Sequence, residues 1–456
     1  MSRVTRHRKL FRSNVNPKAM GALAKLRRAG FDAYLVGGCV RDALYSSFGN
    51  PKGYLESPDW DIATDATARQ VQKILGGRIV SHEEQHRETV FLSWTGTSIE
   101  VTPYRNGAAC IEDDLARRDF TVNVVALDLH GRLLDPFGGV RDIRAGVLRA
   151  VEDPVQRFRE DGLRILRGLR FAAVFGWEIE PETALAIHAE RELLSGIAAE
   201  RVGTELVKML CGVYAPAVMR QFADVLAVVV PEIGPTVGFQ QNNSHHHLDV
   251  WEHTLAVVEA APNVPVLRLA ALLHDLGKPE CYTVDEAGRG HFYGHAARSA
   301  DIARDVMSRL RFSDDMRRRV VALVERHGDI LTDTPSRRTV RRMMANLGAD
   351  VFHDLLTLRR ADIAGHKIET CGRALAACAQ FETLLAELEA EDACFSLKDL
   401  AVRGGDIMEL GYRGPEVGVK LRELLEAVLE EKVPNEREAL MAFLRPEPSE
   451  PAALER

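Results

Sequence analysis

The sequence predicts an α+β domain at the N-terminus followed by a chain that is almost entirely helical. Residues 20–145 mix short β-rich runs with glycine-rich turns and helical stretches, a texture typical of a mixed domain. After residue 154, apolar residues recur at helical spacing and β-rich runs nearly vanish. The β-rich runs of the first region lie at 34–36, 90–92, 99–101 and 122–129.

Four regions are expected, because breaker-rich segments interrupt the helical pattern. The 456 residues, 46% of them hydrophobic, provide enough material for two to four domains with separate cores. A polar segment at 231–244 separates a small helical region from a larger one, and a break near 392–404 sets off a tail. The expected boundaries are 20–145 for the α+β domain, 146–235 and 245–365 for the two helical regions, and 366–456 for the helical tail.

Composition narrows the class of protein. The sequence has no uncharged apolar run approaching about 18 residues and no apolar stretch behind its basic start, so we expect a cytosolic protein without a membrane span. Seven cysteines without a CxxC pair argue against a disulfide framework and a thiolate zinc site. A net charge of −7 excludes a uniformly basic surface, so a polyanionic partner would be bound by local basic patches.

A glycine pair lies between a predicted strand and a predicted helix in the segment 34–44. Gly37 and Gly38 form the turn, and Arg41 follows in the first turn of the helix. Free backbone N–H groups at such a helix start, together with an arginine, suit a phosphate group. This signal alone is weak, so its meaning depends on the acidic residues that follow.

Three carboxylates follow the glycine turn. Asp59 and Asp61 are alternate residues of an extended segment, so both side chains point to one face and can bind hard cations. Glu100 lies in another predicted strand, which can place a third carboxylate beside them. Three carboxylates near a phosphate-binding turn suit two-metal phosphoryl or nucleotidyl transfer. The alternative is that Asp59 and Asp61 are surface turn residues.

Six motifs follow one another along the first half of the chain. They are LVGGCVRDAL, PDWDIATDATARQV, IEVTPYR, DDLARRDFTVNVVALD, DPFGGVRDIRAGVLRAV and REDGLRILRGLRFAAVFGWEI. Their order resembles that of the bacterial tRNA CCA-end nucleotidyltransferase and poly(A) polymerase family, over residues 20–240. The resemblance implies a polymerase-β-like nucleotidyltransferase head at 20–145 and an all-α neck at 146–235.

The same resemblance assigns roles to residues of the head. It implies that Asp59 and Asp61 bind Mg²⁺ and that Glu100 is a further catalytic carboxylate. The incoming nucleotide, CTP or ATP, is expected to contact two groups of residues. Gly37, Gly38 and Arg41 would line its triphosphate, while Arg118, Asp119 and Asn123 would hold its sugar and phosphates.

Asp161 and Arg164 lie three positions apart in the segment EDGLR, which we place on a helix beginning near Val155. An accepting aspartate and a donating arginine fit the base edges of cytosine and adenine, whereas guanine and uracil present the reverse pattern. A wrong base would leave buried polar groups unpaired, at about 1–3 kcal/mol each. By resemblance, this segment matches the protein-based templating motif of the family. The alternative is an ordinary surface ion pair between the two residues.

One segment departs from the enzymes that build the full CCA end. Those relatives carry a considerably longer, charged loop between the strand that ends at Arg105 and the acidic residues before RRDF, and this sequence has only residues 106–111 there. The short segment resembles relatives that add only two cytidines, which implies a second enzyme that adds the terminal A. The alternative, that another segment replaces the loop, stays open.

Histidine and aspartate residues recur in the larger helical region. Adjacent His274 and Asp275 lie in LAALLHDLGK, between His253 and Asp362. This order resembles the HD metal-dependent phosphohydrolase domain, here at 245–365. The resemblance implies that His253, His274, Asp275 and Asp362 bind a divalent transition metal, and that His295 and His327 are candidate ligands of a second ion. The alternative is a set of buried histidines satisfied by hydrogen bonds.

Arginine clusters recur on the predicted helices, at 157–170, 317–319 and 337–342. A charge run is usually a solvated face, yet several on one helical arm suit RNA phosphates. The two resemblances together imply a tRNA nucleotidyltransferase fused to an HD phosphohydrolase domain and a tRNA-binding helical tail. It would add C and A, or C alone. Two alternatives stay open: a poly(A) polymerase, or a phosphohydrolase whose head only binds RNA.

Overall fold

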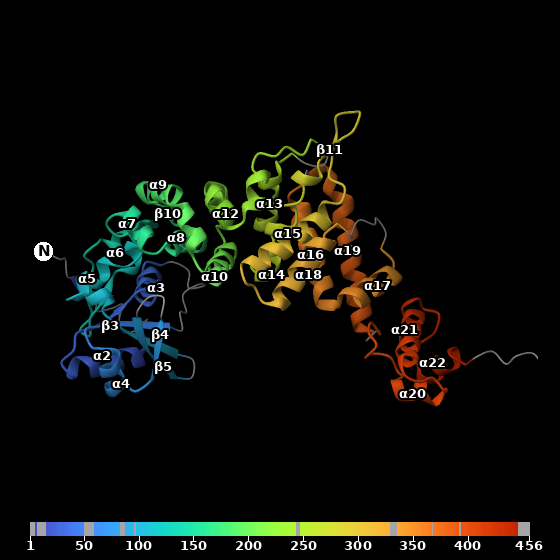
Figure 1. Cartoon of the computed structure of the whole chain (residues 1–456), viewed down its shortest axis with the longest axis horizontal. Coiled ribbons are helices and arrows are strands. Elements are labelled where there is room, and N and C mark those ends of the chain that lie inside the picture. Colours follow the sequence, from blue (N-terminus) through green and yellow to red (C-terminus); the bar gives the residue numbers. More distant parts are fainter. Residues whose placement is uncertain are drawn as a thin grey trace, which may run out of the picture. The chain divides into compact units, whose positions relative to one another are not determined.

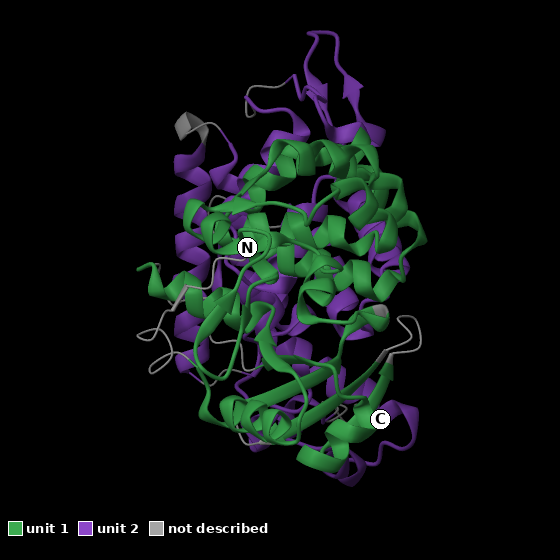
Figure 2. Ribbon diagram, turned by 90° about the vertical axis from the view of Figure 1, so that its left-hand side faces the viewer, with its two compact units in different colours: residues 1–234 green, residues 235–456 purple. Residues whose placement is uncertain are grey.

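Residues 1–234 and 235–456 form two units, which Figure 2 colours separately. The first contains a mixed α/β head and the helices that follow it, and the second is mainly helical (Figure 1). The computed structural model describes residues 5–6, 15–49, 59–82, 87–94, 97–242, 247–328, 335–366, 368–391 and 394–445.

The head of unit 1 is built on a mixed sheet. Among the described residues the sheet has eight strands, in the order β1-β8-β7-β2-β3-β6-β5-β4. β3 runs parallel to β6, and the neighbouring strands pair antiparallel. The elements are β1 (Thr5–Arg6), α2 (Pro17–Arg28), β2 (Ala33–Val36), α3 (Gly38–Ser47), β3 (Asp59–Thr64), α4 (Ala68–Leu75), β4 (Arg78–His82), β5 (Arg87–Trp94), β6 (Thr97–Pro103), α5 (Ile111–Ala116), β7 (Ala126–Leu127), β8 (Arg132–Leu134) and α6 (Gly139–Ala145).

Strand periodicity places the acidic residues of the sheet away from its core. In β6, Ile99 and Val101 are fully buried, whereas Glu100 between them is half-buried. Successive side chains of a strand point to opposite faces, which explains this alternation. The β-rich runs expected at 34–36, 90–92 and 99–101 are confirmed as parts of β2, β5 and β6.

The β-rich run expected at 122–129 is only partly a strand. A 3-10 helix, Thr121–Asn123, precedes β7. Thr121 Oγ1 donates to Asp142 Oδ2 at 2.8 Å, and Asn123 Nδ2 donates to Asp119 Oδ1 at 3.1 Å. The backbone N–H groups of Asn123 and Val124 donate to the carbonyls of Phe120 and Thr121 at 2.9 and 3.2 Å, so they are not available for strand pairing and the strand begins later than its composition indicates.

Helices surround α8 in the second half of unit 1. α8 packs against α10 and α11, and its buried Ile165, Leu166, Leu169 and Ala173 confirm the predicted helical spacing. The only strands described here are β9 and β10, which pair in parallel. The elements are β9 (Val147–Leu148), α7 (Pro154–Glu160), α8 (Leu163–Phe175), β10 (Glu178–Ile179), α9 (Pro181–Ala189), α10 (Ala199–Leu210), α11 (Ala215–Gln221) and α12 (Ala223–Val229).

The single helix expected through EDGLR is wrong, because the chain breaks there into two helices. α7 ends at Glu160, Asp161 is extended, and α8 begins at Leu163. Asp161 Oδ1 accepts a hydrogen bond from the Leu163 N–H at 3.1 Å, which satisfies a donor at the start of α8. Gly162 suits the break, since a Cβ atom there would lie 2.9 Å from Leu193 Cβ.

Unit 2 packs its helices around α18. This helix contacts α13, α14, α16 and α17, and a short hairpin of β11 and β12 precedes α15. The elements are α13 (Val250–Ala260), α14 (Pro265–Leu273), β11 (Thr283–Val284), β12 (Gly290–His291), α15 (His295–Arg309), α16 (Asp314–Arg326), α17 (Arg337–Leu347), α18 (Ala349–Ala364) and α19 (Ile368–Ala390).

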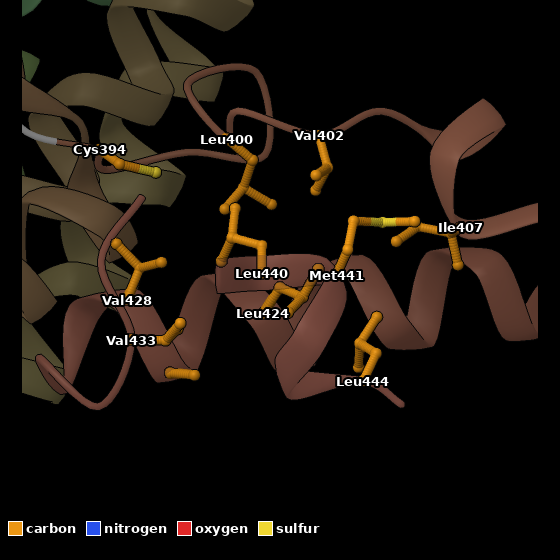
Figure 3. Close-up of a cluster of buried hydrophobic side chains, with 11 residues drawn as sticks. Cys394, Leu400, Val402, Ile407, Leu424, Val428, Val433, Leu440, Met441 and Leu444 are labelled. Carbon is orange, nitrogen blue, oxygen red and sulfur yellow. The ribbon is translucent and has the colours of Figure 1, made fainter. Parts of the chain in front are cut away.

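The tail after α19 has an apolar core of its own, shown in Figure 3. Its helices are α20 (Gly404–Glu409), α21 (Pro415–Leu429) and α22 (Arg437–Phe443). Burial of these side chains holds the three short helices together, because none is long enough to be stable by itself. The core residues are Cys394, Leu400, Val402, Ile407, Leu424, Ala427, Val428, Val433, Leu440, Met441 and Leu444.

The structure agrees with the expectations about cysteines and membrane spans in the described residues. The seven cysteines are free thiols. In the described ranges, no single helix has the length and apolar character of a membrane span, although α10 and α11 meet that test together as a pair bent by 120°.

Candidate functional site

β2, β3 and β6 bring the catalytic candidates to one level of the sheet. Asp61 is the cross-strand partner of Val36, the last residue of β2, and also of Glu100 on β6. Asp59 lies two residues earlier on β3, and its carboxylate accepts a hydrogen bond from Ser98 Oγ. The register therefore places the three residues side by side on β3 and β6, but their carboxylate oxygens are not among the described groups that lie within 4.8 Å of one another. Their joint binding of metal and their catalytic role stay predictions.

Gly37 forms the turn between β2 and α3, directly beside Asp61. Its φ of +75° lies in the region that residues with a side chain rarely adopt. A Cβ atom on Gly37 would lie 2.9 Å from Asp61 Oδ2 and 3.8 Å from Arg118 Nη1. The missing side chain thus leaves Asp61 Oδ2 and the Arg118 guanidinium unobstructed on this side of the turn.

A cleft of about 1640 Å³ opens beside this turn, within unit 1. Asp61 lines it, whereas Asp59 and Glu100 are not among the described residues that do. All residues predicted to bind the nucleotide line the same cleft: Gly37, Gly38, Arg41, Arg118, Asp119, Asn123, Asp161 and Arg164. The tertiary structure therefore unites residues of the head with residues of the neck.

Arg41 is buried in this cleft and held on several sides. Its Nε donates to Asp42 Oδ1 and its Nη1 donates to Asn123 Oδ1, both at 2.8 Å. The ring centroids of Phe171 and Phe175 lie 5.0 and 4.9 Å from the guanidinium carbon. Contacts from three segments fix the cation before a ligand binds, so little reorganisation opposes phosphate binding.

Asp119 is a buried carboxylate that orients two neighbours. Its Oδ1 accepts from Asn123 Nδ2 at 3.1 Å, and its Oδ2 accepts from Arg167 Nη2 at 2.6 Å. Burial alone would raise the pKa of Asp119, but the charge and hydrogen bonds of Arg167 hold that pKa well below its usual range. Asp119 therefore stays ionised and positions Asn123 and Arg167.

Arg118 is oriented by a second buried carboxylate. Its Nε and Nη2 donate to Asp114 Oδ2 at 3.0 and 2.8 Å, while the Arg105 N–H donates to Asp114 Oδ1 at 2.9 Å. Burial opposes ionisation of Asp114, yet the two arginines lower its pKa. The two-point bond turns the remaining Nη1 group of Arg118 toward the turn at Gly37.

Asp161 and Arg164 are held by separate partners, so the alternative of an ion pair between them is wrong. Asp161 Oδ2 accepts from Arg201 Nη2 at 3.3 Å. Arg164 Nη1 donates to Glu160 Oε2 at 3.0 Å, and its Nη2 donates to the Arg117 carbonyl at 2.9 Å. Both residues line the cleft.

Sequence reasoning missed the partners that hold these residues. Glu160 belongs to EDGLR and could have been recognised there. Arg167 lies one helical turn after Arg164 within a predicted RNA-binding cluster, and it is paired with Asp119. Arg201 comes 40 residues after Asp161 on another helix, so no local pattern indicates the contact.

Every arginine of the three predicted RNA-binding clusters has an acidic partner. All five arginines in 157–170 pair with carboxylates within unit 1. Those at 317–319 pair with aspartates of α16 and α18. Those at 337–342 pair with glutamates in or directly after α19 and directly after α21. Contact with RNA at these clusters stays a prediction.

The histidine and aspartate candidates of unit 2 converge in two triads. The first is His253, His274 and Asp362, and the second is Asp275, His295 and His327. Within each triad the candidate ligand atoms lie within 4.8 Å of one another. They come from five helices or helix ends, so the spatial cluster depends on the packing of unit 2.

Each of the four histidines presents Nε2 to the centre, because its Nδ1 faces a backbone carbonyl. The distances from Nδ1 to oxygen are 3.2 Å for His253 with Gly365, 2.9 Å for His274 with Ala271, 2.7 Å for His295 with Phe292 and 2.7 Å for His327 with Val324. Such contacts place the proton on Nδ1 and leave Nε2 for a metal. The Nε2 atoms then face each other at 3.3 Å in one triad and 3.2 Å in the other.

Asp275 is suited to bridge the two triads. Its Oδ2 lies 3.0 Å from His274 Nε2, and its Oδ1 lies 3.5 Å from His295 Nε2. Both oxygens are buried without a hydrogen bond, and Lys278 Nζ lies 2.7 Å from Oδ2 as an ion pair outside hydrogen-bond geometry. Two features of this centre suit divalent metal ions: the Nε2 lone pairs of paired histidines face each other, and the buried Asp275 carboxylate has no hydrogen bond.

His366 is a further residue of this centre that the sequence did not single out. Its ring is stacked on that of His253, with centroids 5.3 Å apart, and its Nε2 lies 3.6 Å from Asp362 Oδ1. Burial lowers the pKa of His366 to about 4. The side chain thus adds a neutral imidazole to the edge of the first triad.

Three family models match the chain in succession. The Poly A polymerase head domain matches residues 33–149, a probable RNA- and SrmB-binding site of polymerase A matches 176–234, and a putative tRNA nucleotidyltransferase domain 2 matches 295–444. The CC-adding tRNA nucleotidyltransferase of Thermus thermophilus is 33% identical over 91% of this chain and 93% of its own length. The chain belongs to the CCA-adding tRNA nucleotidyltransferase and poly(A) polymerase family.

Other members of the family are similar over nearly the whole chain. The A-adding tRNA nucleotidyltransferase of Deinococcus radiodurans is 33% identical over 87% of this chain and 91% of its own length. The crystal structure of the Bacillus stearothermophilus CCA-adding enzyme with CTP has a TM-score of 0.70 and 27% identity, covering 94% of this chain and 97% of that one. Family membership thus covers the head, the neck and the helical C-terminal region.

Proposed function

We propose that the chain is a nucleotidyltransferase that adds C to the 3′ end of tRNA without a nucleic-acid template. The observation that carries this proposal is the single cleft in which all predicted nucleotide-binding residues meet Asp61. The names of similar proteins describe CC, A and CCA addition, and the similar Bacillus structure contains CTP. Site and relatives therefore support nucleotidyl transfer to tRNA.

The carboxylates of the head fit Mg²⁺, which prefers oxygen ligands. Mg²⁺ bound at Asp59, Asp61 and Glu100 would favour ionisation of the attacking hydroxyl and neutralise the triphosphate. The RNA 3′-oxygen forms a bond to the α-phosphorus, the bond to the bridging oxygen breaks, and pyrophosphate leaves with the electron pair. The hydroxyl proton is released to solvent, while Arg41 and Arg118 hold the triphosphate in line.

An incorporation assay tests this function. The purified protein is given tRNA without its terminal CCA, and labelled CTP, ATP, UTP or GTP singly and in combination. We expect Mg²⁺-dependent incorporation of C, with UTP and GTP rejected. Repeated addition of A to an unstructured RNA would instead identify a poly(A) polymerase. RNA binding without any transfer would leave only the RNA-binding alternative.

We further propose that addition stops after two cytidines and that a second enzyme supplies the terminal A. The connection after β6 is short, since it holds only the 3-10 helix Arg105–Gly107 before α5 begins at Ile111. Six residues at about 3.3–3.6 Å each cannot reach far across the cleft. The CC-adding and A-adding relatives are both 33% identical to this chain, so the proposal rests on the short connection.

A second activity is proposed for unit 2, namely metal-dependent phosphoester hydrolysis. The two facing triads and the unsatisfied Asp275 favour this proposal, because they suit a pair of divalent transition metals sharing one carboxylate. Ions bound there would activate water as a nucleophile. Lys278 and Arg359, which pair with Asp275 and Asp362, would keep these carboxylates oriented.

Metal reloading tests the second activity. The protein is stripped with a chelator, supplied with Mn²⁺, Co²⁺ or Ni²⁺, and assayed for release of nitrophenol from bis-p-nitrophenyl phosphate. We expect hydrolysis only with added ion, and loss of hydrolysis in His253→Ala. Ion binding measured by calorimetry without hydrolysis would show a structural metal site instead.

A further inference from the structure

Most, but not all, of the basic residues that line the nucleotide cleft have an acidic partner. Ten basic residues line it, and eight of them pair with a carboxylate at 2.6–4.0 Å. The other two, Arg117 and Lys208, form no ion pair or side-chain hydrogen bond with any described residue. Their charge is therefore available to an anion from outside the protein.

Arg117 and Lys208 come from different parts of unit 1. Arg117 is exposed at the C-terminal end of α5, and its main chain is held because its carbonyl accepts from Arg164 Nη2 at 2.9 Å. Lys208 is exposed in the last turn of α10, where a helix end favours a positive charge. The two cations thus stand on elements of the head and of the neck that line one cleft.

The size of the cleft indicates a second occupant. Its volume of about 1640 Å³ exceeds the range of about 300–1,000 Å³ that is usual for one small ligand. Transfer also requires the acceptor hydroxyl within about 3–3.5 Å of the reacting phosphorus, so the RNA end must enter the same space. Exposed, unpaired cations suit a mobile chain of phosphates that exchanges at each turnover.

We propose that Arg117 and Lys208 bind backbone phosphates of the single-stranded 3′ end of the acceptor RNA. The inference rests on the proposed transfer to tRNA and assigns the two residues to the acceptor rather than to the incoming nucleotide. Both act as positioning residues, since they would hold the strand whose terminal hydroxyl reacts.

Salt dependence of RNA binding tests the proposal. The Kd of tRNA ending in CC is measured by filter binding at several salt concentrations, without nucleotide, for Arg117→Ala, Lys208→Ala and the double variant. Each lost contact should reduce the slope of log Kd against log salt by about 0.7, and the double loss by about 1.4. The KM for tRNA should rise while the KM for CTP stays unchanged, and Arg117→Lys and Lys208→Arg should retain most binding.

Two controls distinguish binding of the single-stranded acceptor end from a general effect of removing positive charge. Lys73→Ala, on α4 outside the cleft lining, should bind like the wild type. A tRNA with a blunt acceptor stem should bind wild type and double variant alike, because it has no single strand to enter. An unchanged salt slope, or a raised KM for CTP alone, would overturn the proposal. Wild-type protein that adds no nucleotide to tRNA would instead refute the proposed function.

Discussion

Asp61 lies where the turn after β2 meets β3 and β6, and its surroundings show how single residues define the site. The register places Glu100 directly beside it, and Gly37 leaves its Oδ2 accessible. The other charged residues of the cleft are mostly held by partners. Their positions are therefore set in advance, which is the condition for electrostatic stabilisation of a transition state.

Asp61→Ala should reduce nucleotide addition by more than about a hundredfold, equivalent to about 2.7 kcal/mol or more in the barrier. The affinity for tRNA should change little, because the carboxylate would bind metal rather than RNA. Turnover and tRNA Kd are measured side by side. Asp65→Ala, an exposed aspartate just beyond β3, is the matched control and should keep wild-type turnover. Retention of more than a tenth of turnover in Asp61→Ala contradicts the assignment.

Asp161→Ala and Arg164→Ala should relax base choice, raising incorporation of UTP or GTP relative to CTP by about tenfold or more. The reason is that each variant removes one side of the acceptor and donor pair. Arg201→Ala should shift base choice in the same direction, because Arg201 holds Asp161 at 3.3 Å. Competition among the four nucleotides on one tRNA measures the effect. Wild-type preference in all three variants would exclude base reading by this pair.

At the scale of elements, the break before α8 determines which residues face the cleft. α7 ends at Glu160, and α8 starts two residues after Asp161, so the two helices can take different directions. α8 then carries Arg164 and Arg167 into the cleft at helical spacing. The ion pair between Arg167 and Asp119 ties α8 to the segment that follows α5.

Arg167→Met should destabilise unit 1 by about 3 kcal/mol at pH 7, because it leaves Asp119 buried without its cation. The pKa of Asp119 is lower in the folded wild type than in the unfolded chain, where it is about 3.9. The ionised carboxylate therefore stabilises the fold fully above about pH 3.9, and this stabilisation is lost as pH falls from there toward the lower, folded-state pKa. The difference in the free energy of unfolding between wild type and variant should therefore decrease from pH 5 to pH 3. Urea unfolding at several pH values measures it.

The matched control for this pair is the double variant Asp119→Asn with Arg167→Met. Removing both charges should cost less than removing the arginine alone, since no buried charge is left unpaired. If the loss of stability in the double variant equals the sum of the losses in Asp119→Asn and in Arg167→Met, the two residues act independently.

At the scale of the whole molecule, the two candidate sites lie in separate units. The nucleotide cleft is lined by residues of unit 1, and both histidine triads belong to unit 2. Neither site contains a described residue from the other unit. The proposed activities should therefore be separable by substitution.

His274→Ala combined with Asp275→Ala should abolish metal-dependent hydrolysis while CTP addition stays within about twofold of wild type. The physical reason is that these residues bind ions of unit 2 and do not touch the cleft. Both activities are assayed on one preparation, with circular dichroism to confirm that the variant is folded. Simultaneous loss of both activities in a folded variant would mean that this metal centre serves the transfer reaction.

With CTP and ATP supplied together, the protein should stop after two cytidines or add the terminal A much more slowly. Cytosine and adenine offer similar edges to Asp161 and Arg164, but the larger purine requires the pocket to change shape. The short connection at 106–111 provides little chain for such a change. Product sizing on a denaturing gel measures the outcome. Efficient formation of the full CCA end would disprove the CC-only proposal and leave transfer to tRNA intact.

Local pattern was sufficient for several elements and for many of the site residues. Alternation predicted that Asp59 and Asp61 share a face of β3, and a glycine pair between a strand and a helix predicted the turn at Gly37. Local pattern was not sufficient at 160–164, where apolar spacing favours one helix and the side chain of Asp161 instead caps a second one. Capping depends on a single hydrogen bond, to which hydrophobic periodicity is insensitive.

The sequence by itself determined the family of motifs, the strand and helix pattern and the residue types available for phosphate and metal binding. Only the tertiary structure decided the partners: Arg201 for Asp161, Arg167 for Asp119 and His366 for His253. These contacts join residues on different elements, and their distances depend on how helices pack. Periodicity along the chain reports which face of an element is buried, but it does not report which residue of another element lies against it.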